Sequence, residues 1–392
     1  MNTSRLFQII SAFAVVATFA AAAERNNITI LHRFKGAGGC DALTLSGSTL
    51  YGMTSGALGG GDSMVFKINC DGSGYTILHS FAKGSDDWSH PVGLPTLSGS
   101  TLYGVTSAAG MGKNQGVVFK INTDGTGYAN IHSFAGGNND GSSPYGSPVL
   151  SGSNLYGVTL HGGSGNVGVL FKINTDGSGF TILHSFASNG NDGYRPSGPL
   201  ILSGSTLYGM TESGGVDHAG VVFKINCDGS GYTILHSFSI GRRNEGCRPT
   251  GSLTLSGSSL YGLTRFGGSK NLGVLFKVNT DGSGFANLHS FISGSDDGMW
   301  PYGSLTLSGT SLFGVTRNGG SRDMGVAFKI NSDGSGFTNI HSFAGVLDRG
   351  DSDNIIGPSG WLTLSGTSLY GVTQDVMKFG VQGVVFKLDV AP

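Results

Sequence analysis

The chain has 392 residues, 70 of them glycine, and carries a formal net charge of −1 with only 12% charged residues. Since 38% of the residues are hydrophobic, the composition excludes a disordered chain and predicts many short strands joined by tight turns. The balanced charge gives no reason to expect binding to nucleic acid or to an anionic membrane surface.

The first 23 residues have the pattern of a secretory signal peptide. Arg5 supplies a positive charge, residues 6–19 are mostly apolar, and residues 20–23 are all alanine or similarly small, as a cleavage site requires. The apolar run is too short for a spanning helix, and no second one follows. We therefore expect a secreted, extracellular protein without a membrane span, in which residues 24–392 form one domain. A buried N-terminal helix is the alternative interpretation.

Three short motifs recur through the rest of the chain, seven times each, with a spacing of about 52 residues. They are Leu-(Tyr/Phe)-Gly, Phe-Lys and His-x-Phe. The first of them begins at Leu50, Leu102, Leu155, Leu207, Leu260, Leu312 and Leu369. Such regular spacing indicates seven copies of one structural unit.

A single copy, taken from Pro301 onward, predicts four strands, named a to d in chain order. We expect them at residues 303–308, 311–316, 326–331 and 337–343, with tight Ser-Gly and Asp-Gly turns after strands a and c. Four antiparallel strands in about 50 residues are typical of one propeller blade. No stretch has a helical period, which excludes a helical solenoid.

The two ends of the chain predict how the repeats close. The last copy ends after its strand c, at 386–388, and has no strand d. A lone strand d, at 28–34, opens the mature chain. The sequence therefore predicts an all-β, seven-bladed β-propeller with four antiparallel strands per blade, in which the N-terminal strand joins the last blade and removes the open edges.

The repeated residues resemble the GloVer repeat of bacterial "choice-of-anchor" surface proteins. The resemblance is carried by Leu-Tyr-Gly-x-Thr, Gly-Gly, Gly-Val-x-Phe-Lys, Leu-His-Ser-Phe and Asp-Gly-x-x-Pro, of which residues 155–196 show the whole run. It implies a secreted or surface-attached propeller and supplies no catalytic residues. Because no C-terminal anchor is visible, we expect release rather than attachment. The blades also look kelch-like, although Tyr or Phe stands where kelch blades usually carry Trp.

An acidic residue precedes a proline by four positions in five of the loops that join strand d to the next strand a. These residues are Asp87, Asp140, Asp192, Glu245 and Asp297. One interpretation is a local turn in which the carboxylate accepts backbone N–H bonds. The other is a ring of Ca²⁺ or ligand sites; otherwise no cofactor is expected. One histidine per strand d has a structural interpretation, because neighbouring copies lie far apart.

The residues that differ between copies gather in the d-to-a and b-to-c loops, which an antiparallel blade places on one face. Aromatic, arginine and carboxylate side chains together suit sugars or acidic glycans. The candidate binding residues are Trp88, Tyr145, Tyr194, Arg195, Arg248, Arg265, Trp300 and Arg317. A solvated loop surface is the alternative. The four cysteines fall at opposite ends of their strands, so we expect them to be unpaired.

Two classes of function remain open on the sequence. The first is a monomeric, non-enzymatic binding scaffold for a glycan or an extracellular protein. The second is an extracellular carbohydrate-active enzyme, a polysaccharide lyase or hydrolase, which would need paired carboxylates. The nearly symmetric acids favour binding, whereas the uneven distribution of arginines leaves the enzyme open.

Overall fold

The computed structural model describes residues 27–34, 37–56, 63–81, 90–107, 115–190, 192–241, 244–343, 358, 360–373 and 383–390, with the side chains of 37–41 and 56 left out. All regular elements in these ranges are β-strands. The described residues include no helix long and apolar enough to cross a membrane.

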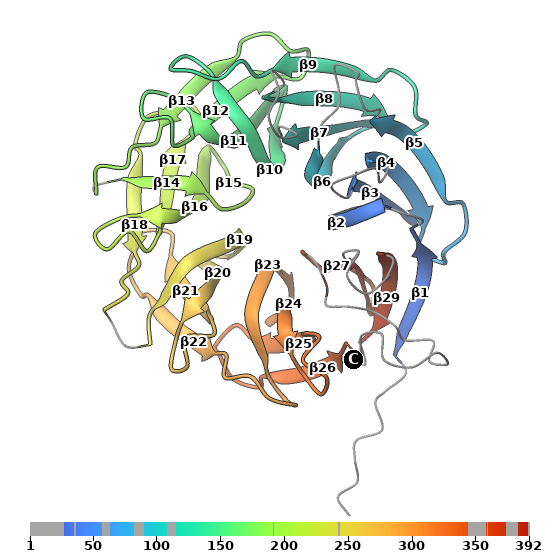
Figure 1. Cartoon of the computed structure of the whole chain (residues 1–392), viewed down its shortest axis with the longest axis vertical. Coiled ribbons are helices and arrows are strands. Elements are labelled where there is room, and N and C mark those ends of the chain that lie inside the picture. Colours follow the sequence, from blue (N-terminus) through green and yellow to red (C-terminus); the bar gives the residue numbers. More distant parts are fainter. Residues whose placement is uncertain are drawn as a thin grey trace, which may run out of the picture.

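The strands form seven antiparallel sheets arranged as a ring around one axis (Figure 1). Blades 1 to 3 comprise β2 (Ala37–Ser46), β3 (Thr49–Gly56), β4 (Ser63–Asn69), β5 (Thr76–Phe81), β6 (His90–Ser98), β7 (Thr101–Ser107), β8 (Gly116–Asn122), β9 (Ala129–Ser133), β10 (Gly141–Ser151), β11 (Asn154–Gly162), β12 (Val169–Asn174) and β13 (Thr181–Ser185). Blades 4 and 5 comprise β14 (Gly193–Pro196), β15 (Ile201–Ser203), β16 (Thr206–Gly214), β17 (Val221–Asn226), β18 (Thr233–Ser237), β19 (Gly246–Ser256), β20 (Ser259–Gly267), β21 (Val274–Asn279) and β22 (Ala286–Ser290). Blades 6 and 7 comprise β23 (Gly298–Ser308), β24 (Ser311–Gly319), β25 (Val326–Asn331), β26 (Thr338–Ser342), β27 (Thr363–Ser365), β28 (Ser368–Val372), β29 (Val384–Asp389) and β1 (Ile28–Arg33). The seven-bladed propeller predicted from the repeats is confirmed.

Blade 7 is completed by the N-terminal strand, as the ends of the sequence predict. β1 pairs antiparallel with β29, and Ile30 stands opposite Phe386. The sheet order β27–β28–β29–β1 matches the inside-to-outside order of the other blades. Figure 1 shows the two differently coloured ends of the chain meeting in this blade. The ring therefore closes by strand pairing between residues more than 350 positions apart.

Strands a and b are longer than the sequence predicts. In blade 6, β23 begins at Gly298 rather than 303, and β24 continues to Gly319. The sequence predicts that strand a begins after its proline. In the structure Pro301 pairs with Thr316 inside the sheet. Its missing N–H is tolerated because strand a is the innermost strand of its blade and has a neighbour on one side only.

Phenylalanines of strands c and d fill the space between blades, which explains two of the repeated motifs. Phe171 on β12 is fully buried and packs edge-on against Phe134, from strand d of blade 2, at 5.3 Å between ring centroids. A Cβ at Gly157, the glycine of Leu-Tyr-Gly, would fall 2.5 Å from Cζ of Phe171. The glycine of the motif thus leaves room on strand b for the phenylalanine ring of strand c.

The structure places the described cysteines as the strand pattern indicates. Cys227 follows the end of β17, while Cys247 lies at the start of β19. Cys70, Cys227 and Cys247 are free thiols. The Cys40 side chain lies outside the described residues.

Candidate functional site

A hollow that is open to solvent lies at the centre of the ring. Its walls come from the first strands of blades 2, 3, 5 and 6, from the segment between β14 and β15 and from the residues before β27, so segments far apart in the sequence meet there. Six glycines contribute backbone, and the larger side chains are Tyr145, Tyr302, Trp361 and Pro199. We refer to this space, defined by those residues, as the central hollow.

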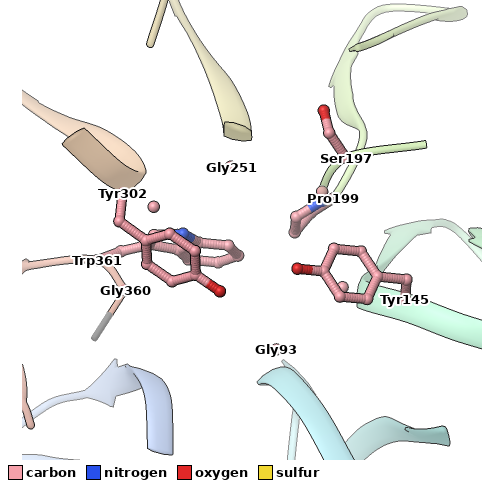
Figure 2. Close-up of a pocket in the computed structure, with 11 residues that line it drawn as sticks. Gly93, Tyr145, Ser197, Pro199, Gly251, Tyr302, Gly360 and Trp361 are labelled. Atoms are coloured by element: carbon pink, nitrogen blue, oxygen red, sulfur yellow. The ribbon is translucent and has the colours of Figure 1, made fainter. Parts of the chain in front are cut away.

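The aromatic side chains of the central hollow face one another across it. Figure 2 shows Tyr302 and Trp361, from neighbouring blades, overlapping on one side, with the Tyr145 ring pointing toward them from the opposite side. Ser197 and Pro199 lie between β14 and β15 and form a third wall. Aromatic faces with phenolic hydroxyls and an indole N–H combine apolar surface with hydrogen-bonding groups.

A second group of residues precedes the residues that line the hollow by two or three positions along the chain. In blades 3 to 6 the residue before the strand's proline has a positive φ, between 52° and 56°. These residues are Ser143, Arg195, Arg248 and Trp300. Each donates its backbone N–H to a carbonyl of the preceding blade's b-to-c loop region, at 2.8–3.1 Å. Non-glycine residues seldom adopt this conformation, and such strain concentrates where side chains have a role in binding.

Blade 5 brings two arginines to one aromatic ring. The guanidinium carbons of Arg248 and Arg265 lie 5.9 and 5.2 Å from the centroid of the Phe266 ring. Arg248 also approaches Glu212 of blade 4, at 3.9 Å between Nη1 and Oε1. Beneath them, burial raises the pKa of the Cys247 thiol, with the Arg248 charge opposing it, so Cys247 is a poor nucleophile.

The described acidic residues of the d-to-a loops accept hydrogen bonds from their own loops and from adjacent strands. Asp192 accepts hydrogen bonds from His184 Nε2 at 2.9 Å, from Tyr232 Oη at 2.5 Å and from the N–H groups of Ala187 and Gly193. Asp140 and Asp297 bind His132 and His289 and two backbone amides each in the same manner. Glu245 accepts the Ser239 N–H and lies 3.5 Å from His236.

These contacts change the acidity of two carboxyl groups. Burial favours the neutral form of Asp140, but hydrogen bonds from His132 and the backbone outweigh it, so its pKa lies below the usual value. Burial of Asp192 is likewise outweighed by hydrogen bonds from His184 and Tyr232, which lowers its pKa. Both carboxylates are therefore ionised at neutral pH, and Asp140 accepts three and Asp192 four hydrogen bonds. No group of three or more His, Cys, Asp or Glu in a metal-binding arrangement occurs among the described residues.

The histidines of strand d hold neighbouring blades together. His184 stacks on Tyr232, the residue that precedes strand d of the next blade, at 3.8 Å between ring centroids. The same stack recurs for His32, His79, His132, His236 and His289. The repeated aromatic at that position thus receives the histidine ring of the preceding blade, consistent with the structural interpretation.

The predicted binding residues fall into separate places. Tyr145 lines the central hollow, whereas the ring of Tyr194 lies 6.4 Å from that of His218 and packs on the core. Arg195, Arg248 and Trp300 occupy the positive-φ positions, and Arg265 and Arg317 are exposed near the ends of β20 and β24. Asp87 and Trp88 lie outside the described residues.

Sequence reasoning missed the role of Trp361 and did not select Tyr302. Trp361 follows Gly360 one residue before Leu362, at a position that is Ser in blades 3, 5 and 6 and Pro in blade 4. The available signal was an aromatic residue in a single copy, at a position that holds Ala, Leu, Ser or Pro in the other copies. Comparing the copies position by position within strand a would have found it.

The fold and this site define a seven-bladed β-propeller with an aromatic-lined hollow at its centre. Residues 38–254 and 240–392 match the family model described as the Gloeobacter/Verrucomicrobia repeat. The chain belongs to this family, which the resemblance in the sequence had suggested. A search of curated proteins found no match.

Solved propellers share the architecture at low sequence identity. An oligogalacturonate lyase in complex with manganese superposes with a TM-score of 0.56 at 13% identity, over 88% of this chain and 86% of that one. The Niastella koreensis GH74 enzyme has a TM-score of 0.56 at 15% identity, over 88% and 52%. A Mycobacterium tuberculosis puromycin-hydrolyzing peptidase has 0.56 at 12% identity, over 92% and 52%. The chain spans about half the length of the last two, and these likenesses show the fold alone.

Proposed function

We propose that the protein is a secreted, non-enzymatic scaffold that binds a glycan in the central hollow. The observation that supports this most is the convergence of Tyr145, Tyr302 and Trp361 on one space that is open to solvent. Sugar rings present apolar faces and hydroxyl edges, which aromatic faces with O–H and N–H groups complement. Tyr145 and Tyr302 stand on β10 and β23, so these two side chains are held before the ligand arrives.

A carbohydrate-active enzyme on the same fold is the rival function. A glycoside hydrolase needs two carboxylates about 5 to 9.5 Å apart at the scissile bond. Among the described residues that line the hollow there is neither a carboxylate nor an imidazole, and Asp140, Asp192 and Asp297 are engaged by their own loops. These observations favour binding over turnover.

A glycan array followed by calorimetry on the best ligand tests the proposal. Trp361→Ala should weaken binding at least tenfold, because the indole forms one wall of the hollow. Tyr194→Ala is the matched control: it removes an aromatic from the same face but outside the hollow, and should leave affinity unchanged.

Two outcomes would contradict the proposal. Equal binding by wild type and the Trp361 variant would place the ligand elsewhere. Accumulation of shortened or unsaturated saccharides during long incubation would show turnover and support the rival function.

A further inference from the structure

The rim around the hollow has one pair of positions that changes from blade to blade. In each of blades 3 to 6, the positive-φ residue of strand a lies between two register pairs, and one residue of strand b lies between the same two pairs. In blade 5, Cys247 pairs with Phe266 and Pro249 with Thr264, which leaves Arg248 beside Arg265. The backbone of this rim pair is thus fixed while its side chains are free to differ.

The content of the rim pair sets blades 5 and 6 apart. Blade 3 carries Ser143 and Leu160, and blade 4 carries Arg195 and Glu212, one residue of each charge sign. Blade 5 carries two arginines, and blade 6 carries Trp300 and Arg317. At these positions blades 5 and 6 hold three arginines and no carboxylate, in one sector of the face. We define this sector as Arg248, Arg265, Phe266, Trp300 and Arg317 and name it the rim sector.

The two arginines of blade 5 stand on neighbouring strands, near one aromatic ring. Like charges on neighbouring strands repel, and both guanidinium groups lie within 6 Å of one Phe266 ring. In the described part of the chain, the Glu212 carboxylate lies within 4 Å of the Arg248 guanidinium group. No such contact is found there for Arg265. Side chains of Arg248 and Glu212 are 56% and 37% exposed, so a dissolved ligand can reach them. A carboxylate on the ligand would relieve this repulsion.

The rim sector adjoins the central hollow through one strand. β23 carries Trp300 in the rim sector and, two residues later, Tyr302 in the hollow. A strand rises about 3.4 Å per residue, so the two rings are anchored roughly 7 Å apart along the backbone. A saccharide chain that occupies the hollow can therefore continue onto the rim sector, with Trp300 available for stacking and the arginines for its charged groups.

We infer that the rim sector makes the protein selective for carboxylate-bearing polysaccharides over neutral ones. The planar guanidinium fork matches a carboxylate with two parallel hydrogen bonds, and it is anchored here on Phe266. This inference rests on the proposed glycan binding and adds the class of glycan: a uronic-acid polymer whose sugar rings enter the hollow and whose carboxylates meet Arg248 and Arg265.

The test compares two forms of one polymer that differ at the carboxyl group, which is ionised in one and methyl-esterified in the other. Polygalacturonate and its fully methyl-esterified form are titrated into the whole protein at 50 mM and 200 mM NaCl. We expect the acidic form to bind at least tenfold more tightly at low salt, and this preference to shrink at high salt because exposed charges are screened. Arg248→Gln with Arg265→Gln should abolish the preference, whereas Lys172→Gln, which removes a positive charge from strand c of blade 3, should preserve it.

The outcomes separate this inference from the proposed function. Equal binding of both forms, lost in Trp361→Ala and unchanged in the double arginine variant, overturns the rim sector and keeps the hollow. Acid-selective binding lost in the double arginine variant, but unchanged in Trp361→Ala, supports the rim sector and overturns the hollow. Absence of binding to either form by correctly folded wild type counts against both.

Discussion

At the residue scale, Asp192 shows how a recurring acid is used by the fold. Its carboxylate is almost fully buried and accepts four hydrogen bonds, two of them from side chains of neighbouring blades. Asp192→Asn should lower the free energy of unfolding by about 2 kcal/mol at pH 7, because hydrogen bonds to a charged group are lost. Asp296→Asn, an exposed acid in an equivalent loop, should change it by less than about 0.5 kcal/mol. Chemical denaturation measures both.

The same substitution has a defined pH dependence. The folded pKa of Asp192 is lowered, so its contribution to stability is fully present above the unfolded pKa, about 3.9, and is lost as the pH falls through the folded value. The stability gap between wild type and Asp192→Asn should therefore be constant from pH 7 to 5 and narrow below about pH 4. A gap that stays undiminished at pH 3 would mean that the ionised carboxylate is not what stabilises the loop.

Some residue roles could be predicted from sequence and others could not. The acids and histidines repeat, so a structural use was the simplest interpretation, and their contacts agree with it. The neighbourhood of Arg248 and Arg265 could not be foreseen, because it depends on strand a continuing past its proline with a positive φ. Trp361 was missed because a single aromatic in one copy carries no periodic signal.

At the scale of the element, the ring closure makes β1 as important as any internal strand. Phe34 follows β1 and Phe186 follows β13 at the equivalent place, with 1% and 0% exposure. Each packs edge-on against a strand c phenylalanine, at 5.2 and 5.5 Å between ring centroids.

Replacing either Phe34 or Phe186 with alanine should lower the free energy of unfolding by about 3–5 kcal/mol, as for other fully buried phenylalanines. The two losses should agree within about 1 kcal/mol. Ile77→Ala, on an exposed position of a strand d, is the control. A markedly milder effect at Phe34 would indicate that blade 7 is held less firmly than blade 3.

Strand order followed from the sequence because the repeat reveals its own boundaries, and the missing strand d could be matched to the lone one at the other end. Strand lengths did not follow as well. The outer parts of strands a and b vary between copies, and their pairing is fixed by contacts with the preceding blade's loops, such as Arg248 N–H to the Ala219 carbonyl. Such contacts between units leave no pattern within one unit.

At the scale of the whole molecule, the blades approach most closely around the central hollow. Backbone meets backbone there: a Cβ at Gly251 would fall 1.9 Å from the carbonyl oxygen of Gly303 in the next blade. Gly257, in the a-to-b turn of the same blade, has a similar positive φ, +58° against +71°, but nothing within 4 Å of its Cβ position. Alanine substitutions at these two glycines therefore distinguish the cost of backbone strain from the cost of crowding between blades.

Gly257→Ala should lower stability by about 1–2 kcal/mol, the cost of a left-handed conformation for a residue with a Cβ. Gly251→Ala adds a clash that only movement of whole blades can relieve, so it should cost several kcal/mol more and widen the hollow. Thermal unfolding measures the first effect, and glycan affinity measures the second. Because Tyr302 and Gly303 are adjacent on β23, blade displacement at Gly251 should weaken ligand binding without touching any aromatic side chain. Equal destabilisation by the two variants, with affinity retained in both, would mean that the ring yields locally and that the close approach of the blades does not set the geometry of the hollow.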